Sequence, residues 1–81
     1  MDKSQVTKKL EEVIREVLPE INDIDMNVSI SKEYGVNSMS LIEIIVATEK
    51  KFDVSFTDFE LALPLYDTFD DLVTLIEEKI S

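Results

Sequence analysis

Residues 35–52 read GVNSMSLIEIIVATEKKF and contain the most apolar run of the chain. Leu, Ile, Val, Glu and Lys dominate the chain as a whole, and this mixture favours helix over strand. The apolar residues of this stretch would cover more than one side, so we predict a helix from Ser38 to about Lys51 that is either central or carries a contact surface. Gly35 is the only glycine of the chain. Because glycine permits backbone conformations that strain other residues, Gly35 is expected to set the angle at which Ser38 stands near solvent.

Upstream of this stretch, the apolar spacing predicts a helix over residues 4–18, which Pro19 ends. Residues 19–37 then form a long connection in which apolar residues alternate with Asn, Asp and Ser. A single strand would have no partner here, so we expect a loop pinned to the core by its apolar residues. A short turn at residues 31–34 interrupts it. A loop this long in a small domain is usually functional or packed down.

Downstream, residues 53–56 should be extended, and Thr57 and Glu60 match a capping box, in which the two residues satisfy each other's free backbone donors. We therefore predict a short helix from about residue 58 to residue 63, stopped by Pro64. Thr68 and two acidic residues open a last helix, because acids are favoured at the positive end of a helix dipole.

These elements sum to an all-α, four-helix bundle with three main helices, a short third helix and a long first loop. The chain has 81 residues and 44% of them are hydrophobic, which predicts a single domain, residues 1–81, with a thin core.

The composition excludes several classes of function. The net charge is −10, from 18 acidic and 8 basic residues, so nucleic acid and anionic membranes are not expected partners. Basic patches on partner proteins would complement it. The chain has no cysteine and no histidine, which excludes disulfides, zinc clusters and catalysis by these residues. No membrane-spanning run or signal peptide is visible, so we expect a cytoplasmic monomer.

Asp23, Asp25 and Asn27 match the first three ligand positions of an EF-hand calcium loop. The required glycine is Val28 and the required bidentate glutamate is Tyr34. Capping of turns in a polar loop is therefore the favoured interpretation of these side chains.

Ser38 is the residue whose position carries chemical information. A phosphate ester on a serine at a helix start would meet free backbone N–H groups and the positive end of the dipole. An ordinary N-cap serine would occupy the same place. The residues alone leave both interpretations open.

The motif Gly35-Val36-Asn37-Ser38-Met39 resembles the acyl carrier protein family and its peptidyl and D-alanyl relatives, whose second helix begins with Gly-x-Asp-Ser-Leu. The apolar, glutamate-bearing continuation to Phe52 resembles the family's second helix. Residues 66–73, YDTFDDLV, look like the entry to its last helix. The resemblance covers essentially the whole chain.

The resemblance implies that Ser38 accepts 4'-phosphopantetheine from coenzyme A through a phosphopantetheinyl transferase, with Gly35, Asn37 and Met39 completing the attachment motif. The terminal thiol of that arm would carry acyl or aminoacyl groups as thioesters. The chain would then be a carrier, not an enzyme, and its partners would be the loading and processing enzymes.

The resemblance also implies that the helix starting at Ser38 is the recognition face. Glu43 and Glu49 would meet basic residues of partners, and Met39 and Ile42 would make apolar contacts beside the arm. The alternative is that the two glutamates are plain solvated charges and the two apolar residues plain core.

Three departures from the family pattern bear on the pathway. Asn37 replaces the usual Asp, Met39 replaces the usual Leu, and Ser40 stands where fatty-acid carriers often have an acid. Together with the basic residues Lys50 and Lys51, these residues make the recognition helix less acidic than that of the family's fatty-acid members. We therefore expect a discrete carrier of a specialised pathway, such as polyketide or nonribosomal peptide assembly, rather than of primary fatty-acid synthesis. The alternative is an unmodified carrier-fold protein that acts as a docking module.

Overall fold

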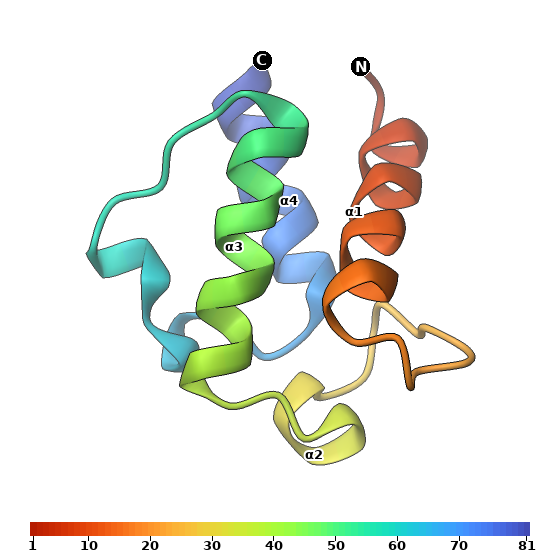
Figure 1. Cartoon of the computed structure of the whole chain (residues 1–81). Helices are drawn as coiled ribbons and strands as arrows, with labels where there is room; N and C mark the ends of the chain where they lie inside the picture. The colour runs from red at the N-terminus through yellow and green to blue at the C-terminus, as the bar shows by residue number, and fades with distance from the viewer.

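The computed structural model describes residues 1–81, and its regular secondary structure is entirely helical, which confirms the predicted fold class. The elements, in chain order, are α1 (Lys3–Val17), α2 (Ile30–Tyr34), α3 (Ser38–Phe52), the 3₁₀ turns η1 (Phe59–Leu61) and η2 (Leu63–Leu65), and α4 (Phe69–Ile80). The helix α1 packs against both α3 and α4, and α2 lies at the end of the bundle where α3 begins (Figure 1).

The helix α1 begins one residue before its predicted start. Asp2 is its N-cap and forms a reciprocal capping box with Gln5, which supplies two of the partners that a helix start lacks. Four apolar residues on one face are fully buried: Val6, Leu10, Val13 and Ile14.

One cluster of 16 buried apolar side chains forms the core. The three long helices supply most of it, and Met26, Ile30 and Val36 add the apolar side chains of the long connection. Thr48 on α3 is the only buried polar side chain, and its Oγ1 donates to the carbonyl oxygen of Ile44 at 2.8 Å. The core therefore leaves no buried side-chain donor or acceptor unpaired.

The long connection is packed down, as predicted, but it contains a true helix where a turn was expected. Ser29 caps α2, and Gly35 ends it in the left-handed region. Two backbone hydrogen bonds tie the connection to the start of α4. The amide of Ile30 donates to the carbonyl of Asp67, and the amide of Asp70 donates to the carbonyl of Met26, both at 2.9 Å.

Tyr34 organises the acidic part of this connection. Its hydroxyl accepts from the amide of Asp25 at 2.7 Å and donates to the carbonyl of Asp23 at 3.3 Å, while its ring stacks on Phe69. The Asp25 carboxylate accepts from the amide of Asn27 at 2.9 Å. These contacts match the turn-capping interpretation. No three acidic groups in the chain lie close enough to hold a metal ion.

The short helix predicted at residues 58–63 is present as a 3₁₀ turn over Phe59–Leu61 rather than as an α-helix, and its capping box is formed. The amide of Thr57 donates to Glu60 Oε1 at 2.8 Å, and the amide of Glu60 donates to Thr57 Oγ1 at 3.3 Å. The chain then makes two 3₁₀ turns separated by the extended Ala62. Because Pro64 has no N–H to donate to the carbonyl of Glu60, and its ring would clash with that carbonyl, the first turn cannot continue as an α-helix.

The extended segment predicted for residues 53–56 also begins later than expected. Asp53 caps the end of α3 in the left-handed region, with φ 54° and ψ 51°, and is the only non-glycine residue with positive φ. None of the helices combines the length and the apolar character needed to cross a membrane.

Candidate functional site

Ser38 is the first residue of α3, and Asn37, rather than Ser38, is the N-cap. Asn37 Oδ1 accepts from the amide of Ser40 at 3.0 Å and from its hydroxyl at 2.9 Å, and Ser40 Oγ accepts from the amide of Asn37 at 3.1 Å. The interpretation of Ser38 as an ordinary N-cap serine is therefore wrong. With the cap supplied by its neighbour, the Ser38 hydroxyl is exposed and makes no hydrogen bond within the protein.

The backbone around Ser38 offers free donors. The amide of Leu41 donates to the carbonyl of Asn37 and that of Ser40 to its side chain, whereas the amides of Ser38 and Met39 have no acceptor in the chain. These two N–H groups lie beside the exposed hydroxyl.

No acidic residue caps α3 or occupies its first turn. Asp2 caps α1, and Asp70 and Asp71 occupy the first turn of α4, but the neutral Asn37 caps α3 and its first turn holds no acid. No acidic side chain of α3 or of its cap therefore compensates the positive end of the α3 dipole. A phosphate ester on Ser38 would fit it.

Gly35 links α2 to α3. Its φ of 64° and ψ of 24° are the left-handed conformation that an L side chain strains, and its amide donates to the carbonyl of Ile30. The amide of Val36 donates to the same carbonyl at 3.2 Å, and the Val36 side chain is buried. Gly35 thus turns the chain, and Val36 anchors it, just before the serine.

The outer face of α3 is apolar. Met39 is 70% exposed and Ile42 is 39% exposed, so the alternative that they are core residues is wrong. Val46, which the sequence analysis did not single out, is 42% exposed. The spacing of three and then four residues places all three on one side of the helix, which forms an apolar stripe.

The two glutamates predicted to meet partners lie in different environments. Glu43 is exposed and makes no hydrogen bond or ion pair within the chain. Glu49 is half-buried, and its Oε2 accepts from the amide of Phe56 at 2.9 Å. One carboxylate oxygen of Glu49 therefore holds the segment after α3, which leaves Glu43 as the freer acidic group.

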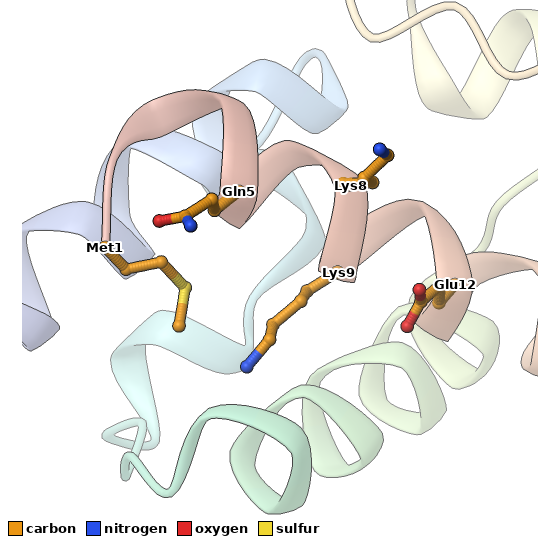
Figure 2. A pocket seen from close by; sticks show the side chains of 5 residues that line it. All are labelled: Met1, Gln5, Lys8, Lys9 and Glu12. Atoms are coloured by element: carbon orange, nitrogen blue, oxygen red, sulfur yellow. The ribbon is translucent and has the colours of Figure 1, made fainter.

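A surface groove lies elsewhere, lined by side chains of the N-terminal segment and α1, which are Met1, Gln5, Lys8, Lys9 and Glu12. In Figure 2, Lys9 reaches from α1 toward the end of α3, where its Nζ lies 5.8 Å from the ring centroid of Phe52, and Lys8 points the other way. Because the N-terminus and the start of α3 lie at opposite ends of the bundle, this groove is not part of the Ser38 site (Figure 1).

Comparison with known proteins agrees with this geometry. The family model described as "Phosphopantetheine attachment site" matches residues 8–76, a span that includes Ser38 and nearly all of the bundle. An acyl carrier protein of Acidothermus cellulolyticus is 33% identical over 63 residues, which cover 75% of this chain and 74% of that protein.

The helical fold and these matches define a carrier protein rather than a catalyst. The chain belongs to the acyl carrier protein family. The predicted cofactor, covalently attached 4'-phosphopantetheine, is the one that this family carries. Membership also implies interaction with a phosphopantetheinyl transferase and with acyl-processing enzymes.

Proposed function

We propose that Ser38 is the residue that bears the 4'-phosphopantetheine arm and that residues 1–81 act as one acyl or aminoacyl carrier domain. The observation that carries this proposal is the free, exposed hydroxyl of Ser38 at the first residue of α3. In the transfer from coenzyme A, Ser38 Oγ bonds to phosphorus and the pyrophosphate P–O bond breaks. Adenosine 3',5'-bisphosphate leaves, and the hydroxyl proton passes to solvent.

The residues around Ser38 support the attachment in distinct ways. The amides of Ser38 and Met39 are available to the phosphate oxygens, and the dipole of α3 favours its negative charge. The box between Asn37 and Ser40 fixes the start of the helix. The arm supplies a terminal thiol that carries cargo as a thioester.

The pathway part of the proposal is a specialised one, such as polyketide or nonribosomal peptide assembly. The neutral cap formed by Asn37 and Ser40 supports it, because partners here meet an amide and a hydroxyl. Lys50 is exposed and Lys51 pairs with Glu12 at 3.0 Å, which reduces negative charge near the end of α3. Partners of this chain would therefore rely less on basic residues along this helix.

The proposed docking surface is the outer face of α3. Its apolar stripe of Met39, Ile42 and Val46 is exposed, and Glu43 lies on the same helix with a free carboxylate. Apolar contact beside the arm and a basic partner residue at Glu43 would position a transferase or a loading enzyme. Glu49 would contribute through the carboxylate oxygen that Phe56 does not use. Action as a monomer in the cytoplasm completes the proposal.

Intact mass spectrometry tests the attachment residue. The purified chain is incubated with coenzyme A, magnesium and a broad-specificity phosphopantetheinyl transferase. We expect a gain of one phosphopantetheine in the wild type, none in Ser38→Ala, and the full gain in Ser31→Ala, a matched exposed serine on the neighbouring α2.

The second candidate is an unmodified docking module, which the exposed stripe on α3 would serve equally well. A folded wild-type chain that gains no mass would favour it. A gain that persists in Ser38→Ala would show that another residue bears the arm.

A further inference from the structure

Phe59 on η1 is the most exposed large apolar side chain of the protein, at 74%. Its neighbours in the same segment point inward, since Phe56, Leu61 and Leu63 pack against the core. Apart from Met1, all exposed large apolar side chains lie on α3 or on the segment that follows it: Met39, Ile42, Val46, Phe59 and Leu65. Large exposed apolar side chains gathered in one region mark interaction surfaces.

A half-buried ion pair fixes the turn that carries Phe59. Lys79 Nζ on α4 lies 2.8 Å from Glu60 Oε1, and the two side chains are 18% and 17% exposed. The hydrogen bond from Lys79 and that from the amide of Thr57 hold the pKa of Glu60 below its ordinary value. The Lys79 ammonium also lies 4.8 Å from the ring centroid of Phe56.

Two further contacts hold the same segment from other directions. The Tyr66 hydroxyl donates to the carbonyl of Glu60 at 2.5 Å, and the amide of Phe56 donates to Glu49 of α3. Phe59 is therefore presented outward on a turn that is tied to both α3 and α4. Little backbone freedom remains to be lost in this turn when a partner binds.

Of the two carboxylates that flank Phe59 in the sequence, one is paired and the other is free. Glu60 is paired with Lys79, whereas Asp58 is exposed and caps nothing. Since η1 contacts α3 and lies alongside it in Figure 1, Phe59 and Asp58 lie on a segment next to the helix that carries Glu43. The combination is an apolar side chain bordered by free carboxylates.

We infer that Phe59 is an anchor of a docking surface that continues from α3 onto η1, where it fills an apolar pocket rimmed by lysine or arginine on a partner enzyme. This inference rests on the proposed carrier function. The rigid aromatic side chain supplies contact area, and the basic rim pairs with Asp58 and Glu43. Lys79 acts as a positioning residue, because it fixes the turn without reaching the partner.

The test measures binding, with the broad-specificity phosphopantetheinyl transferase as the probe. All chains carry Ser38→Ala, so that no modification occurs, and isothermal titration calorimetry gives the Kd. We expect Phe59→Ala to weaken binding about tenfold or more, as for a buried aromatic anchor. Phe59→Leu should recover most of the affinity, and Lys79→Met should give an intermediate loss.

Lys8→Ala is the matched control, because it removes an exposed long side chain from α1 and should leave the Kd unchanged. Circular dichroism checks that each variant is folded. Equal affinity of Phe59→Ala and its parent, or no binding by the parent, would overturn the inference. If wild type gains no phosphopantetheine on incubation with coenzyme A and the transferase, yet binds the transferase in a Phe59-dependent manner, only the attachment at Ser38 would be overturned.

Discussion

The left-handed residue before the candidate site gives the sharpest prediction about stability. In Gly35→Ala, the new Cβ would meet no heavy atom within 4 Å, so the substitution adds no steric clash. Its cost is then the backbone strain of an L residue at φ 64°, about 1 kcal/mol. For a domain of this size, that cost lowers the melting temperature by about 4–8 °C.

Asp53 allows the reciprocal experiment, because it adopts the same left-handed conformation, at φ 54°, although it has a side chain. Asp53→Gly should raise the free energy of unfolding by about 0.5 kcal/mol, and Asp53→Asn controls for the lost charge. Thermal and urea unfolding followed by circular dichroism measure both. If Gly35→Ala proves neutral, or costs several kcal/mol, the strain argument is wrong.

Three further predictions follow from the polar contacts. Asn37→Ala removes the cap of α3 and should cost about 1 kcal/mol in urea unfolding; an unchanged midpoint would contradict the capping role. Lys79→Met should cost about 1 kcal/mol at neutral pH. Because the folded-state pKa of Glu60 lies below 4.5, the contribution of this pair is fully present above that pH. It is lost as the pH falls through the folded-state pKa, so wild type and variant should converge in acid; a constant difference would refute the pairing. Burial raises the pKa of Tyr66 to about 12, so phenolate absorbance of Tyr34→Phe should appear only near that pH; ionisation near pH 10 would show that Tyr66 is accessible.

The long helices could be predicted from the sequence because they carry their signals locally. Apolar residues recur at helical spacing in α1 and α4, and Pro19 and Thr68 mark a helix end and a helix start. Each of these signals lies within a single helix and does not depend on the rest of the fold. The predicted bounds of α1 and α3, and the predicted start of α4, accordingly agree with the structure to within about one residue.

The short elements could not be predicted with the same accuracy. The helix α2 has 5 residues, too few for a periodic pattern, and its caps at Ser29 and Gly35 were the only available signals. In the segment after α3, the capping box of Thr57 and Glu60 indicated a helix start, but the contact between Glu60 and Lys79 of α4 is distant in sequence. The geometry of this segment therefore depends on the assembled bundle.

In the candidate site, too, some features could be predicted from the local sequence and others depend on contacts formed in the folded chain. The position of Ser38 at the start of a helix was predicted, whereas its freedom from capping depends on how Asn37 and Ser40 pair. Glu43 and Glu49 look equivalent in the sequence, but only Glu49 has a backbone amide from a later segment within reach. Phe59 was assigned no role, because nothing local distinguishes an outward phenylalanine from the inward Phe56.

Both chain ends lie together at one pole of the bundle, where Met1 and Ser81 border a common groove, and Ser38 lies at the opposite pole (Figure 1). An affinity tag, a surface tether or a fused protein attached at either end would therefore project away from the serine. A chain immobilised through either terminus should therefore present Ser38 outward, toward soluble enzymes.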